Sequence, residues 1–193
     1  MEDGTTGFVQ NKYSWNKEAN MFYIESPADV GFSLCPDKTE CKWDDENTAD
    51  DNLKAVINLL QKFPEIMNND LYISGESYAG IYVPKLVQRI DKYITDNTGK
   101  AGVYIPKLKG FMVGNGVTNW KYDTTPAFVK MGYWHGLYDD DLYNVIKDCD
   151  YSYYRFDSAK VTGDCKTAMD RFNTLTGAIN GYDVFGKCYT STE

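Results

Sequence analysis

The segment 75–80 (Gly-Glu-Ser-Tyr-Ala-Gly) holds the side chains best suited to chemistry in this chain of 193 residues. An apolar run at 71–74 precedes it, and apolar residues at helical spacing follow it. Strand, small residue, serine, small residue and helix is the order of a nucleophile elbow, a turn so tight that the serine hydroxyl projects from the top of the sheet. Ser77 is therefore the candidate nucleophile. A glycine-serine turn without chemistry is the alternative.

Small residues at 75, 79 and 80 suit such a turn, because a Cβ at these positions is expected to collide with neighbouring backbone as the chain reverses. The first backbone N–H groups of the new helix then face the space above the serine. Negative charge develops there during acyl transfer, so these N–H groups are candidate oxyanion donors.

A serine hydroxyl also needs a base, commonly a histidine that a carboxylate orients. The one histidine, His135, lies among aromatic residues where two helices are expected to meet, and we interpret it as a packing or hydrogen-bonding residue. Asp91, Asp96 and Asp123 lie between Ser77 and His135, but none follows a clear strand end. The sequence thus offers a nucleophile without a convincing base.

Glu76 is unusual beside a nucleophile, since a carboxylate there repels the developing oxyanion. It becomes useful if the site must hold another carboxylate, because a protonated carboxyl group can donate a hydrogen bond to it. A carboxyl group stays neutral near pH 7 only where burial or a second carboxyl group raises its pKa. Glu76 is therefore either a carboxylate-binding group or a solvated turn residue.

Alternating strand and helix patterns predict an α/β fold with a parallel sheet covered by helices. We predict strands at 19–24, 71–74 and 107–113, a helix over 46–62 that Asp44 or Asp45 caps, and a second helix through 83–94 that Pro84 restarts. Ligand sites in such sheets lie beyond the carboxyl ends of the strands. Glu25, Ser77 and Asn115 follow strand ends, so we expect them to gather on one side.

The pattern changes after residue 123. Short helices are expected at 126–134 and 139–147, and an irregular region from Cys149 onward. We therefore divide the chain into a core segment, 1–123, and the start of a helical, cap-like insertion, 124–193. Three parallel strands leave both sheet edges exposed. We expect the chain to be incomplete at both ends, and poorly stable or self-associating alone.

Composition limits the partners. The net charge of −8 disfavours nucleic acid. No apolar run reaches the ~20 residues of a membrane span, and the first residues lack a signal-peptide pattern. With one histidine and no Cys-x-x-Cys pair, we expect no metal site and no cofactor.

Five cysteines suggest a compartment in which disulfides form. Cys35 and Cys41 bracket one short polar loop, and Cys149 and Cys165 bracket another polar segment. Cys188 is left over, with a partner elsewhere. Reduced thiols in a cytosolic protein are the alternative.

Residues 75–80, followed by Tyr-Val-Pro at 82–84, resemble the nucleophile motif of the serine carboxypeptidases. Segments 13–21, 25–33, 109–116 and 135–137 resemble further motifs of that family in the same order. The resemblance covers nearly all of residues 10–190. It implies part of an α/β-hydrolase that removes C-terminal amino acids from peptides or proteins, best at acidic pH. It also implies a secretory, lysosomal, vacuolar or extracellular location.

The resemblance assigns roles to individual residues. It makes Ser77 the nucleophile and the Tyr78 backbone N–H one oxyanion donor. Glu76 is expected to be one of a carboxyl pair that binds the substrate's C-terminal carboxylate. Glu25 and Asn115 are possible site-lining residues because they follow strand ends, independently of the resemblance. The family's disulfides fit a Cys149–Cys165 bridge and a partner for Cys188 beyond residue 193.

The chain also departs from the family pattern. It lacks the upstream Asn-Gly-Gly-Pro-Gly-Cys-Ser-Ser segment, which holds the second oxyanion donor, and the strands with the catalytic aspartate and histidine. Asp29 replaces a small residue of the Ser-Pro turn. We expect a central portion of the catalytic domain, inactive alone, with a second chain as one source of the missing parts. A non-catalytic structural or interaction subunit and an acyltransferase are the alternatives.

Overall fold

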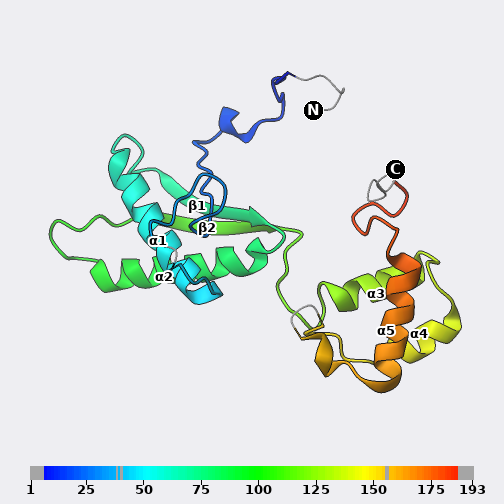
Figure 1. The fold of residues 1–193 in the computed structure, drawn as a ribbon. Helices are drawn as coiled ribbons and strands as arrows, with labels where there is room; N and C mark the ends of the chain where they lie inside the picture. The colour runs from blue at the N-terminus through cyan, green and yellow to red at the C-terminus, as the bar shows by residue number, and fades with distance from the viewer. Residues whose placement is uncertain (1–6, 38, 40, 155–156, 187–193) are drawn as a thin grey trace.

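Parallel pairing of two strands organises the first part of the chain. The computed structural model describes residues 7–37, 39, 41–154 and 157–186. In chain order the elements are a 3₁₀ turn η1 (Trp15–Lys17), α1 (Asp45–Lys62), β1 (Asp70–Glu76), α2 (Ala79–Asn97), β2 (Lys107–Gly114), α3 (Thr125–Trp134), α4 (Asp140–Ile146), a 3₁₀ turn η2 (Ser158–Lys160) and α5 (Gly163–Thr176). Figure 1 shows α1, β1, α2 and β2 in one group and α3, α4 and α5 in another.

Strand β1 pairs in parallel with β2 from Asp70 opposite Lys107 to Glu76 opposite Gly114. The crossover helix α2 packs on both strands, and α1 packs on α2. Their shared core holds four buried residues, Val56, Leu60, Leu86 and Ile90. Leu71, Ile73 and Leu108 add apolar side chains from the sheet. The two strands predicted at 71–74 and 107–113 and the α/β fold class are confirmed.

Helix α1 begins at the predicted place. The Asp44 carboxylate accepts hydrogen bonds from the N–H groups of Glu46 and Asn47, both at 2.8 Å. The Asn47 side chain accepts one from the Asp44 N–H at 2.9 Å, which completes a capping box. Of the two predicted candidates, Asp44 is therefore the residue that caps α1. The Asp45 side chain is not used in the cap and is available for another contact.

The sequence predicted that Pro84 restarts the second helix. This prediction is wrong, because Pro84 lies inside one continuous helix, α2. A proline inside a helix removes its own N–H from the ladder of hydrogen bonds, and its ring crowds the carbonyl of the residue four positions earlier. Val83 and Leu86, on either side of it, are both buried. Burial of these neighbours holds the helix together across the missing bond.

The strand predicted at 19–24 is wrong, because the described residues of that segment form neither strand nor helix. Phe22, Tyr23 and Ile24 are exposed. Strand structure requires a neighbouring backbone edge, and the sheet of the described chain has only two strands, β1 and β2. The apolar run shows strand propensity, but no described strand pairs with it.

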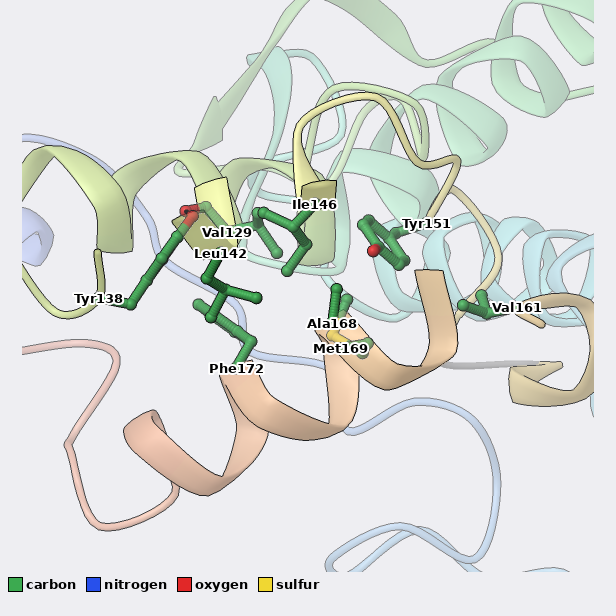
Figure 2. Close-up of a cluster of buried hydrophobic side chains, with 9 residues drawn as sticks. All are labelled: Val129, Tyr138, Leu142, Ile146, Tyr151, Val161, Ala168, Met169 and Phe172. Atoms are coloured by element: carbon green, nitrogen blue, oxygen red, sulfur yellow. Dashed lines mark hydrogen bonds between the residues drawn. The ribbon is translucent and has the colours of Figure 1, made fainter. Parts of the chain in front are cut away.

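A second core joins α3, α4 and α5 (Figure 2). Ala168, Met169 and Phe172 of α5 share one buried cluster with Leu142 and Ile146 of α4, and Phe172 lies beside Leu142. The Tyr138 hydroxyl donates to the Val129 carbonyl at 2.6 Å. The short helices predicted at 126–134 and 139–147 are confirmed.

Helix α5 corrects the irregular region predicted after Cys149. Its buried residues Ala168, Phe172 and Thr176 recur every four positions, which is the apolar period of a helix. Surrounding tyrosines, cysteines and glycines concealed this period, and the helix forms because its apolar face covers α4.

Both local cysteine pairs are bonded, Cys35 with Cys41 and Cys149 with Cys165. The alternative of reduced thiols is therefore wrong for these four cysteines, and Cys188 lies outside the described residues. No helix in the described part of the chain is long and apolar enough to cross a membrane.

Ion pairs tie α1 to α2. Glu46 pairs with Lys85 and Arg89, and Arg89 also donates to Asp50 at 2.7 Å. The hydrogen bond from Lys85, and then the one from Arg89, lowers the pKa of Glu46. A carboxylate whose pKa is lowered on folding stabilises the folded state above its unfolded pKa and loses that effect as the pH falls through its folded pKa.

We predict that Glu46→Gln destabilises the protein at about pH 7 and has a much smaller effect at about pH 3, on either side of the ordinary glutamate pKa of about 4.3. Urea unfolding of both proteins at the two pH values measures this difference. Asp51→Asn is the control, since the one ion pair of Asp51 within the described residues is with Lys54 on its own helix, at 2.9 Å. An equal effect of Glu46→Gln at both pH values contradicts the assignment.

Candidate active site

Ser77 occupies the turn between β1 and α2 with φ at +61°. This left-handed conformation costs a non-glycine residue about 1–3 kcal/mol and persists only where the surroundings enforce it. Ser77 is exposed. The order of strand, strained serine and helix is the one expected from residues 75–80.

Backbone hydrogen bonds to the loop after β2 hold this turn. The Ser77 N–H donates to the Gly114 carbonyl at 3.0 Å, and the Val117 N–H donates to the Ser77 carbonyl at 2.9 Å. The Gly80 N–H donates to the same carbonyl at 3.0 Å. The conformation of Ser77 therefore depends on the pairing of the two strands as well as on the local sequence.

Close packing explains two of the three small residues. A Cβ at Gly75 would meet the Ala79 methyl and approach Val83 Cγ2 at 3.1 Å, and a Cβ at Gly80 would meet the Val117 backbone. Ala79 is different from the prediction, because its methyl group is buried without conflict. That methyl occupies the space that Gly75 leaves open.

The Tyr78 backbone is placed to donate. Tyr78 caps α2 with φ −61° and ψ −14°, and its N–H has no acceptor among the described residues. Helix N-termini carry a partial positive charge, so this N–H suits a developing oxyanion beside Ser77.

The Tyr78 side chain is partly buried and contacts residues of α1, α2 and the loop after β2. Its hydroxyl donates to Asp45 Oδ1 at 3.2 Å, and its ring lies 4.9 Å from the ring of Tyr82 and 6.1 Å from that of Trp120. Burial, followed by the charge of Asp45, raises the pKa of Tyr78.

Glu76 and Asn115 stand at the carboxyl ends of the two strands. Glu76 ends β1 opposite Gly114, and its exposed carboxylate forms no hydrogen bond or ion pair within the described chain. Asn115 follows β2 with φ at +45° and is also exposed. The structure thus places Glu76, Ser77 and Asn115 together at the carboxyl ends of β1 and β2.

Glu25 organises its own turn. Its carboxylate accepts from the Phe32 N–H, and its carbonyl accepts from the Ser33 hydroxyl at 2.6 Å. Gly31, with φ at +56°, leaves room for the carboxylate. Asp29 lies in the same turn at φ +72°. No described hydrogen bond joins the Glu25 side chain to Ser77, and its place in the site stays a prediction.

Two of the other titratable candidates, His135 and Asp123, have structural partners. His135 Nδ1 lies 2.9 Å from the Met131 carbonyl at the end of α3, which fits its interpretation as a hydrogen-bonding residue. The Asp123 carboxylate accepts from the N–H groups of Thr118 and Asn119, and these bonds lower its pKa. Neither side chain has a described contact with Ser77.

The sequence analysis missed the cluster of Tyr78, Tyr82, Trp120 and Asp45. Tyr78 and Tyr82 are four residues apart, which places them on one face of a helix and is a usable signal. Asp45 and Trp120 come from distant segments, and no local pattern connects them to the elbow.

A cavity of about 860 Å³ is lined by residues of segment 15–26, α1, β1 and α2, together with Met112 of β2. Ser74 and Ala79, on either side of the elbow, are among its lining residues. Met21, Ile24, Ile73 and Tyr82 give it a mainly apolar lining.

Comparison with known proteins connects this site to one family. The family model "Serine carboxypeptidase" matches residues 1–193. Serine carboxypeptidase-like 21 of Arabidopsis thaliana is 36% identical over 186 residues, which cover 95% of this chain and 36% of that protein. Serine carboxypeptidase 24 of the same plant is 39% identical over 181 residues, with 91% and 36% covered. The chain therefore spans just over a third of the length of these relatives.

A solved structure supports the fold. A prohormone-processing carboxypeptidase of Saccharomyces cerevisiae aligns with a TM-score of 0.54 and 23% identity, over 80% of this chain and 35% of the yeast protein. At this identity the likeness is one of fold alone, and that fold is the α/β-hydrolase fold.

We predict that Gly75→Ala destabilises the protein by about 1–3 kcal/mol, because the new methyl group overpacks the contact with Ala79. Gly110→Ala is the matched control in β2, where a Cβ lies 3.6 Å from the Tyr72 ring, an ordinary contact. Urea unfolding compares the two variants. Equal free energies of unfolding would show that the elbow does not require close packing at Gly75.

Proposed function

This chain belongs to the serine carboxypeptidase family, and we propose that it carries the nucleophile of a serine-type carboxypeptidase. The enzyme removes C-terminal amino acids from peptides through an acyl-enzyme on Ser77. One observation carries the proposal. Ser77 is exposed at φ +61°, and the neighbouring Tyr78 N–H has no hydrogen-bond acceptor among the described residues.

In the proposed reaction, Ser77 Oγ attacks the carbonyl carbon of the last peptide bond, and its proton passes to a base. The carbonyl oxygen becomes an oxyanion and accepts a hydrogen bond from the Tyr78 N–H. Collapse of this intermediate breaks the C–N bond, and the amino acid leaves with the proton. Water then hydrolyses the ester on Ser77. We assign the base and its acid to a part of the hydrolase fold outside this chain.

Glu76 is proposed to recognise the carboxylate that defines a C-terminal substrate. It neighbours the nucleophile, it is exposed, and its carboxyl group forms no described hydrogen bond, so it is available to a substrate. A protonated carboxyl group donates a hydrogen bond to a carboxylate, and two facing carboxyl groups hold a shared proton more readily at low pH. A partner carboxyl group and an acidic optimum follow from this role. Asn115 lines the same edge.

We propose that further hydrolase segments, from the same polypeptide or a second chain, cover the open parts of the sheet. Tyr72 and Met112 are 56% and 54% exposed on the strands, and the cavity beside β1 offers apolar walls. An uncovered strand edge pairs readily with other chains. The two disulfides within the described residues and the family fit a secretory, lysosomal or vacuolar setting.

We predict that a fluorophosphonate probe labels Ser77 when the hydrolase fold is complete, and that mass spectrometry maps the label to the elbow peptide. Ser77→Ala abolishes it. The 193-residue chain and the longest form made by the source cell are compared. If the longer form labels and the 193-residue chain does not, the result supports the partner proposal. If neither form labels, the non-catalytic alternative replaces this one. Transfer of the acyl group to an added alcohol in preference to water identifies an acyltransferase.

We predict that Glu76→Ala, in the form that labels, lowers kcat/KM for a peptide roughly 10- to 100-fold, which corresponds to one lost hydrogen bond to a charged group. The same variant leaves hydrolysis of an ester without a free carboxylate within about twofold. Asp70→Ala, at the opposite end of β1, is the matched control. Equal losses on both substrates would refute the role of Glu76.

A further inference from the structure

We propose that Asp45 is a positioning residue for the oxyanion donor: it holds the Tyr78 side chain and thereby keeps the Tyr78 backbone N–H aimed at the reacting carbonyl oxygen. The inference rests on the proposed function of Ser77. It connects the first turn of α1 to the elbow, two parts of the chain that are 33 residues apart.

The hydrogen bond is specific to Asp45. Its neighbour Asp44 already caps α1 through Glu46 and Asn47. Asp45 is therefore available, and its Oδ1 accepts from the Tyr78 hydroxyl at 3.2 Å in a partly buried position. Hydrogen bonds to a charged acceptor are stronger than neutral ones. The two adjacent aspartates thus have different roles: Asp44 caps α1, and Asp45 holds the Tyr78 side chain at the elbow.

Two rings restrict Tyr78 further. Tyr82, one turn along α2, meets the Tyr78 ring edge-on at 4.9 Å, and Trp120, from the loop after β2, lies 6.1 Å away. Burial raises the pKa of Tyr78 above its ordinary value of about 10. The hydroxyl therefore remains a donor at acidic and neutral pH, where we propose that the enzyme works.

The side chain controls the backbone through one peptide plane. The plane between Ser77 and Tyr78 carries the donor N–H, and its rotation changes ψ of Ser77 and φ of Tyr78. Anchoring the ring fixes the position of Tyr78 Cα, which is one of the two atoms to which this plane is attached, and so limits shifts of the plane relative to the Ser77 turn. Fixing the ring at Asp45 therefore opposes relaxation of the strained turn, whose conformation needs enforcement by its surroundings.

A purely structural link between α1 and α2 is the competing explanation. Arg89 and Asp50 already provide such a link away from the elbow, at 2.7 Å. Asp50→Ala is thus the matched control for Asp45→Ala. Asp45→Asn keeps an acceptor oxygen without the charge, and Tyr78→Phe removes the donor but keeps the ring.

The first measurement is amide hydrogen exchange in the 193-residue chain, read at Ser77 relative to Ile73 in the middle of β1. We expect the ratio to rise roughly 5- to 10-fold in Asp45→Ala and in Tyr78→Phe, as one hydrogen bond is lost. The double variant should match the single ones, and Asp45→Asn and Asp50→Ala should stay near the unaltered protein. An unchanged ratio in Asp45→Ala overturns the proposal.

The second measurement is the kinetics of fluorophosphonate labelling in the form that reacts. We expect Asp45→Ala to lower the limiting rate of inactivation roughly 10-fold without changing the probe's binding constant, a smaller loss than removal of a whole oxyanion donor. Asp45→Asn should restore most of the rate. The same loss in Asp50→Ala overturns the positioning role. If no form labels at Ser77, the proposed function has failed, and the exchange ratio alone decides whether Asp45 holds the turn.

Discussion

The backbone of Ser77 lies in a left-handed conformation because two strand ends meet beside it. Its N–H donates to the Gly114 carbonyl, and its own carbonyl accepts from the Val117 N–H. Both bonds require the parallel register of β1 with β2, and that register requires α2 to cross back over the sheet. The conformation of the site therefore depends on the pairing of the sheet. The apolar core between the sheet and its helices stabilises that pairing and thereby the position of the Ser77 hydroxyl.

Helix α1 contributes to both stability and the site. Its core residues pack under α2, and its acidic side chains pair with Lys85 and Arg89. Its first turn reaches the elbow through Asp45. Acidic conditions thus have two separate effects: they weaken the ion pairs that hold α1 to α2, and they suit the proposed recognition of a carboxylate by Glu76 at the end of β1. The helical core around Phe172 has its own packing and its own disulfide.

Local patterns predicted the parts of the fold that depend on neighbouring residues. The sequence signals of the elbow, of the Asp44 cap and of the strand at 71–74 can each be read from a few adjacent positions, although the elbow and the strand also depend on pairing with β2. The strand predicted at 19–24 failed because strand formation depends on a distant partner, which short-range propensity cannot supply. Helix α5 was missed although Ala168 and Phe172 keep helical spacing, because the surrounding composition suggested irregular structure. The Tyr78–Asp45 contact joins distant segments, so no periodicity of the sequence predicts it.

The most direct test is the backbone conformation of Ser77 in solution. Nuclear magnetic resonance of the 193-residue chain gives φ of Ser77 from its three-bond coupling constants and chemical shifts, and the protection of its amide from exchange. We predict a positive φ near the observed +61° and a protected N–H, since Gly114 accepts from it. An extended φ with a rapidly exchanging amide would contradict the account, because the sheet would then not enforce the elbow.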